Sequence, residues 1–178
     1  MNRFLSEESI ALHKEYVRQR RVKYSIIESS VEALRGAQIR DVYRLRISSR
    51  DRHDALALLT EIELHELFFS SFCERLYPRS SLVASAYGSE ADFLNLIYRM
   101  ALELPYGFVL IYLIGGRLEV RGLTDTQDAF RTYSPTLAID VCEHVYFTDY
   151  GFDKARYLST ALPYLDFTRL SVSRNADG

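Results

Sequence analysis

Hydrophobic residues recur at helical spacing through the first half of the chain. Ser6, followed by two glutamates, is typical of a helix start, and Gly36 is typical of a helix end. The pattern between them predicts a helix over residues 7–34, and a second helical pattern covers residues 55–76 before Pro78. Two long helices joined by a short connection predict an antiparallel helical hairpin.

The second half of the chain changes from helical spacing to short apolar runs separated by glycines. Helices are expected at residues 91–102 and 157–165, and strands at residues 108–114, 117–121 and 137–141. The predicted fold class is therefore α+β. An N-terminal helical hairpin domain (1–82) precedes a C-terminal α+β domain (83–178) with a small three-stranded antiparallel sheet.

Composition and charge narrow the class of protein further. Of the 178 residues, 48% are hydrophobic and 26% are charged, and the net charge is −2, which gives no overall basic field for nucleic acid. The longest apolar run is strand-sized, so we expect no membrane span. Two distant cysteines and an N-terminus without an apolar segment favour the cytoplasm or, after removal of a transit peptide, the mitochondrial matrix.

Candidate chemistry rests on the histidines, of which the chain has four. His13 and His65 lie mid-helix among apolar neighbours on the two predicted helices, and Asp140 and His144 are four residues apart. Facing helices of a hairpin can hold imidazoles close together, and imidazoles with one carboxylate suit iron or manganese, with zinc also possible. A histidine on an apolar helix face is more often a core residue, so spacing alone leaves both interpretations open. His53 lies in a charged stretch and is expected to be exposed.

The residues around these positions resemble the motifs of the iron/manganese superoxide dismutases. Residues 138–147 (AIDVCEHVYF) resemble the family's D-x-W-E-H-A-Y signature. Residues 64–69 (LHELFF), 88–93 (GSEADF) and 126–128 (TQD) resemble N-H-x-x-F-W, G-S-x-x-x-F and N-Q-D, in the family's order. The resemblance extends over roughly residues 6–170, and its most specific part is the stretch around Asp140 and His144.

The resemblance implies a metal site between the two domains and a redox activity. His13, His65, Asp140 and His144 would be the ligands of one iron or manganese ion, which would dismutate superoxide or act on another small anion. Further roles are implied outside the ligand set: Gln127 would hydrogen-bond the metal's solvent ligand, Tyr146 would lie behind the ligands, and Glu143 would join two subunits of a homodimer.

Several positions depart from the family pattern. Val17 and Arg21 stand where the family has its gateway His and Tyr, although Arg21 could attract an anion. Phe108 (or Leu110), Cys142, Leu162 and Phe167 stand in place of tryptophans. Glu61 stands where iron-type members carry a glutamine, and its carboxylate could bond the solvent ligand or the metal.

These departures leave two alternatives to a working dismutase. One is a structural or interaction subunit, and a nucleic acid or large assembly enters as a partner only under this alternative. The other is a metalloprotein with altered redox chemistry.

Overall fold

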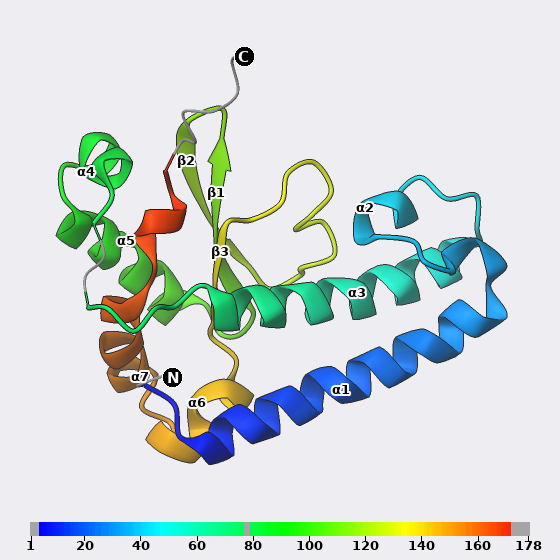
Figure 1. Cartoon of the computed structure of the whole chain (residues 1–178). Coiled ribbons are helices and arrows are strands. Elements are labelled where there is room, and N and C mark those ends of the chain that lie inside the picture. Colours follow the sequence, from blue (N-terminus) through cyan, green and yellow to red (C-terminus); the bar gives the residue numbers. More distant parts are fainter. Residues whose placement is uncertain (1–3, 77–78, 172–178) are drawn as a thin grey trace.

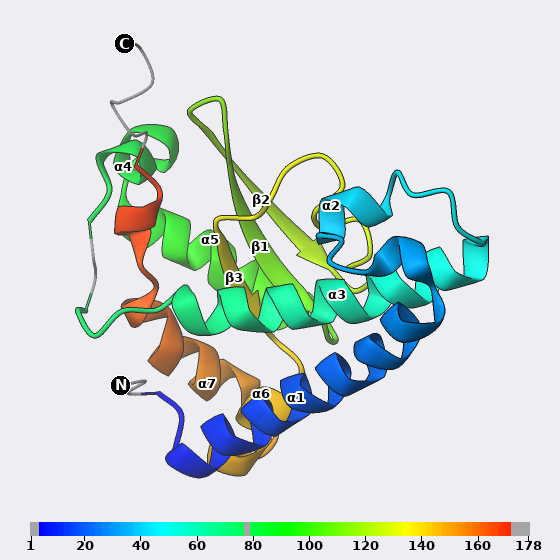
Figure 2. The same ribbon diagram turned by 45° about the vertical axis from the view of Figure 1, so that its right-hand side comes forward.

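The N-terminal half is a helical hairpin, as predicted. The structure is a computed structural model, and it describes residues 4–76 and 79–171. Helices α1 (Glu7–Ser30) and α3 (Ser49–Ser70) run antiparallel, and a short 3-10 helix, η1 (Glu32–Leu34), and α2 (Ile39–Val42) lie in the connection between them (Figure 1). One face of α3 packs against α1 and the other against the sheet (Figures 1 and 2), so α3 connects the hairpin to the C-terminal half.

The ends of α1 follow from local chemistry. The Ser6 hydroxyl accepts a hydrogen bond from the Ser9 amide at 3.1 Å, which caps the start of the helix as predicted. The α-helix ends at Ser30, four residues before the predicted end, because Val31 has an extended backbone. The hydroxyl of Ser30 also bonds back to the carbonyl of Ile27, a contact that competes with helical hydrogen bonding.

Both predicted ends of the second helix are wrong. The helix begins at Ser49 instead of residue 55 because Ser48 caps it by accepting a hydrogen bond from the Asp51 amide. It ends at Ser70 instead of residue 76 because the chain beyond it bonds to another segment, in which the Asp166 amide donates to the Ser71 carbonyl at 2.8 Å. Pro78 lies outside the described residues.

The C-terminal half confirms the predicted α+β class. Its three-stranded antiparallel sheet has the order β2-β1-β3, from β1 (Phe108–Ile114), β2 (Arg117–Leu123) and β3 (Leu137–Asp140). The helices of this half are α4 (Ser81–Tyr87), which was not predicted, α5 (Glu90–Glu103), α6 (Glu143–Tyr150) and α7 (Lys154–Ala161). The 3-10 helices η2 (Leu162–Tyr164) and η3 (Phe167–Arg169) follow α7, where a continuous helix to residue 165 was expected. The predicted domain boundary at residues 82 and 83 falls inside α4 and remains a prediction.

Strand β3 places the candidate ligands from the C-terminal half. All four of its residues are buried, and its last residue, Asp140, lies opposite Phe108 of the central strand β1. Helix α6 begins three residues later and carries His144 in its first turn. The strand end and the helix start therefore lie near the N-terminal part of α1, which carries His13, and the C-terminal part of α3, which carries His65. None of the described helices combines the length and hydrophobicity that crossing a bilayer requires.

Candidate metal centre

Four side chains from four elements converge between the two halves of the molecule. His13 comes from α1, His65 from α3, Asp140 from the end of β3 and His144 from α6, and one donor atom of each lies within 4.8 Å of the others. From the Asp140 Oδ2 atom, the Nε2 atoms of His65, His144 and His13 lie at 3.4, 3.6 and 3.8 Å. Donor atoms bound to one first-row metal at about 2.1 Å lie roughly 3 to 4 Å apart, so the cluster has the dimensions of a metal site.

Each element directs its ligand for a local reason. On α1 the buried residues Ser9, His13 and Val17 are four apart, so the inward face of this helix carries a histidine. On α3 the Nδ1 atom of His65 lies 2.5 Å from the Glu61 carbonyl oxygen, which makes Nδ1 the donor. The Nε2 atom of His65, 3.2 Å from Nε2 of His144, therefore carries a lone pair that can bind a metal.

Asp140 is held on one side and free on the other. Its Oδ1 atom accepts a hydrogen bond from the Cys142 amide at 2.9 Å, and its backbone carbonyl accepts one from the Tyr157 hydroxyl at 2.9 Å. Among the described residues, the buried Oδ2 atom of Asp140 and both ring nitrogens of His13 have no hydrogen-bond partner. Buried polar atoms are costly without a partner. A cation bound between them would satisfy Oδ2 and one nitrogen of His13, so the donor set fits a metal ion.

Burial prepares the imidazoles for metal binding. Desolvation lowers the pKa of His13 to about 2 and those of His65 and His144 to about 4. The three rings are therefore neutral near pH 7, the form in which they bind metals. Desolvation also raises the pKa of Asp140 to about 7, so its ionised form gains from a nearby cation. Three neutral imidazoles and one carboxylate are ligands that suit iron or manganese.

The comparison with protein families agrees with this geometry. Residues 79–173 match the family model for the C-terminal domain of iron/manganese superoxide dismutases, which is just over half of the chain. The chain belongs to the iron/manganese superoxide dismutase family. A search of curated proteins gave no match. The matched region contains Asp140 and His144, while His13 and His65 lie before it and are placed by the helical hairpin.

Glu61 and Tyr146 lie close to the ligands without joining the cluster. The Glu61 carboxylate pairs with Arg20 at 2.5 Å and lies outside the group of four potential ligands. The buried Tyr146 ring stacks on Tyr157, whose hydroxyl bonds to the carbonyl of Asp140. Tyr146 thus supports the carboxylate through a neighbour.

Gln127, Arg21 and Glu143 do not reach into the cluster. Gln127 lies 3.4 Å from the exposed His53, which is twelve residues before His65 on α3, or about 18 Å along the helix. The expected bond of Gln127 to a metal-bound solvent does not fit this place, because the loop between β2 and β3 turns toward the far end of α3. Arg21 is an exposed residue that pairs with Glu66 on the outer side of the hairpin. Glu143 is exposed at the start of α6, beside His144.

Two residues at the centre were missed by the sequence analysis. The Tyr16 ring stacks on His144 with centroids 4.8 Å apart, and Arg20 lies over the Tyr16 ring at 4.3 Å. Tyr16 and Arg20 are three and seven residues after His13, positions that share its side of a helix. That spacing was the available signal. Among the tryptophan replacements, Phe108 contacts His65 edge-on at 5.3 Å.

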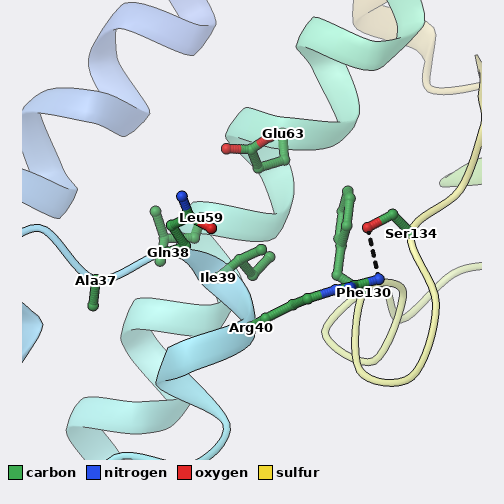
Figure 3. A pocket seen from close by; sticks show the side chains of 8 residues that line it. All are labelled: Ala37, Gln38, Ile39, Arg40, Leu59, Glu63, Phe130 and Ser134. Carbon is green, nitrogen blue, oxygen red and sulfur yellow. Dashed lines mark hydrogen bonds between the residues drawn. The ribbon is translucent and has the colours of Figure 1, made fainter.

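A separate cavity of about 520 Å³ lies beside the middle of α3, next to Leu59 and Glu63. It is bounded by α2, α3 and the loop that contains Phe130 and Ser134 (Figure 3). The Arg40 guanidinium at its edge donates a hydrogen bond to the Ser134 hydroxyl at 3.1 Å (Figure 3). Glu63 is the single carboxylate of its lining, so this cavity lacks the ligand set that marks the metal centre.

Proposed function

We propose that the protein binds one iron or manganese ion through His13, His65, Asp140 and His144 and dismutates superoxide. The observation that carries the proposal is the convergence of four ligand atoms within 4.8 Å, three of the four residues being buried. An ion of this kind supplies a one-electron couple that can oxidise one superoxide and reduce the next. The protein's part is to keep the imidazoles neutral and the Asp140 carboxylate ionised, and to hold both in place.

Elemental analysis of the purified protein tests metal binding directly. About one iron or manganese per chain is expected for the wild type and for His53→Ala, and His65→Ala is expected to lose it. Both substitutions remove a histidine from α3, but His53 is exposed and lies about 18 Å along the helix from the cluster. A wild type that binds neither ion after refolding with each would overturn the proposal.

A dismutase assay on metal-loaded protein tests the reaction. Activity above that of the free ion, lost in His65→Ala and kept in His53→Ala, is the expected result. Metal-loaded protein without activity would leave a metalloprotein with altered redox chemistry. Two observations favour this second candidate: Gln127 lies away from the cluster, and Val17 is a buried apolar residue where the family has a histidine.

We further propose that the protein forms a homodimer through the surface around Glu143. Phe147 and Phe152 are 49% and 80% exposed and contact each other edge-on at 5.1 Å, on and just after the helix that carries Glu143. An exposed aromatic pair beside the metal centre supports contact with a second copy. Light scattering should give twice the chain mass for the wild type and a smaller mass for Phe152→Ser. A monomeric wild type at micromolar concentration would contradict the proposal.

A further inference from the structure

Two ion pairs connect α1 to α3, and they differ in their relation to the metal centre. We name Arg20–Glu61 the inner pair and Arg21–Glu66 the outer pair. The side chains of the inner pair are 24% and 34% exposed, and those of the outer pair are 55% and 48% exposed. Consecutive helical residues are separated by about 100° around the axis, so Arg20 and Arg21 leave α1 on different sides.

Tyr16 joins the inner pair to the ligands. Its ring stacks on His144 and lies 5.1 Å from the His65 ring. Its hydroxyl accepts a hydrogen bond from Arg20 at 2.6 Å and lies 3.4 Å from the Glu61 carboxylate. Tyr16 therefore covers the imidazoles and holds the guanidinium above them.

This side of the cluster faces solvent. His144 is the one ligand with a substantially exposed side chain, at 34%, whereas the side chains of His13, His65 and Asp140 are at most 2% exposed. Burial is the main cause of the lowered pKa values of His65 and His144, and the positive charge of Arg20 lowers both further. A small molecule that reaches the cluster past His144 therefore passes Tyr16 and the inner pair.

The inner pair also determines the charge at this entrance. Arg20 is a cation that attracts an approaching anion, and Glu61 is an anion that repels it, with the Nε and Oε2 atoms 2.5 Å apart. Because the two charges nearly cancel, removal of either one changes the net charge beside the cluster by about one elementary charge. The outer pair offers the same two charges on different faces of the two helices, with Arg21 one residue after Arg20 on α1 and Glu66 five residues after Glu61 on α3.

We propose that Tyr16, Arg20 and Glu61 form the entrance of the metal centre and that the Arg20–Glu61 balance controls the binding of small monovalent anions there. The inference rests on the proposed function, because it needs a bound metal ion. It replaces Arg21 with Arg20 as the arginine that acts on an anionic substrate. Glu61 acts as the counter-charge of Arg20 and is not a metal ligand.

Azide binding to the iron-loaded oxidised protein, followed by its absorption spectrum, tests the inference. Arg20→Gln should weaken azide binding by on the order of tenfold, and Glu61→Gln should strengthen it by a similar factor. The double variant should return to within about threefold of the wild type, since both charges are gone. Arg21→Gln and Glu66→Gln make the same charge changes in the outer pair and should alter the affinity by less than about twofold.

Opposite effects of the two inner variants separate this role from a structural one, since both substitutions break the same ion pair. Iron content and Tm of every variant are measured alongside. If Arg20→Gln does not retain iron, the expected gain in azide affinity of Glu61→Gln tests the inference by itself. Iron-loaded inner variants that bind azide as the outer variants do would overturn the inference and leave the proposed function intact. A wild type that binds no metal would overturn the proposed function.

Discussion

Replacing Asp140 with asparagine separates the metal-binding role of this residue from its effect on stability. Asp140 is fully buried, and its Oδ2 atom faces three imidazoles with no hydrogen-bond donor among the described residues. Asparagine has the same shape and keeps an oxygen for the Cys142 amide. Its new N–H group can donate to Nε2 of His65, which accepts because Nδ1 of that ring is bonded to the Glu61 carbonyl.

The size of the effect follows from the pKa of Asp140, which burial raises from 3.8 to about 7. Between these values the folded metal-free protein binds more protons than the unfolded chain, so the stability contributed by this group falls as the pH rises and stays low above pH 7. About three pKa units at roughly 1.4 kcal/mol each set an upper limit of about 4 kcal/mol. The imidazoles have lowered pKa values and act in the opposite direction, but they are present in both proteins and largely cancel in the difference.

Urea unfolding in the presence of a chelator measures this difference. We expect Asp140→Asn to be more stable than the metal-free wild type by about 1 to 4 kcal/mol at pH 8, and by less than half as much at pH 5. Adding iron or manganese should reverse the order, since a thousandfold excess over Kd stabilises the wild type by about 4 kcal/mol. Asp128→Asn makes the same charge change on the surface and should shift stability by under about 0.5 kcal/mol.

The reasoning would be refuted if the metal-free Asp140→Asn protein were less stable than the wild type at pH 8. Such a result would mean that the carboxylate stabilises the fold without a metal. A gain that did not change between pH 5 and pH 8 would also contradict the pKa argument, because it would not come from the ionisation of Asp140.

Three further predictions follow from the same centre. Metal affinity, measured by chelator competition, should rise on the order of tenfold per pH unit between about pH 4 and pH 7 and level off above, because the metal displaces one proton from Asp140. An affinity that does not change over this range would contradict the prediction. Tyr16→Ala should release metal to a chelator severalfold faster than Tyr16→Phe, which keeps the ring over His144, and equal rates would show that the ring does not cover the centre. Gln127→Ala should leave metal content and dismutase rate within about twofold of the wild type, since Gln127 lies beside His53, about 18 Å along α3 from His65. A larger loss would show that Gln127 acts at the metal centre.

Local sequence signals were sufficient for the elements that local interactions build. The capped start of α1, helix α5 and the three strands lie close to where their patterns predicted. The α+β class and the family were likewise predicted from the sequence, because the spacing of apolar residues and a compact motif such as residues 138–147 can be recognised without knowledge of distant contacts. The four candidate ligands were also named from the sequence, and the structure brings them together.

Contacts between distant segments decided the rest. Helix α3 stops at Ser70 because the chain after it bonds to residues 164–166, a partner that no local pattern reveals. Gln127 belongs to a matching motif, yet its loop turns to the far end of α3. Arg20 and Arg21 are adjacent and chemically identical, and only the packing of α1 on α3 turns Arg20 toward the ligands and Arg21 toward the surface. A motif identifies the groups that can do the chemistry, whereas the direction of each side chain depends on helix rotation and loop path, which packing sets.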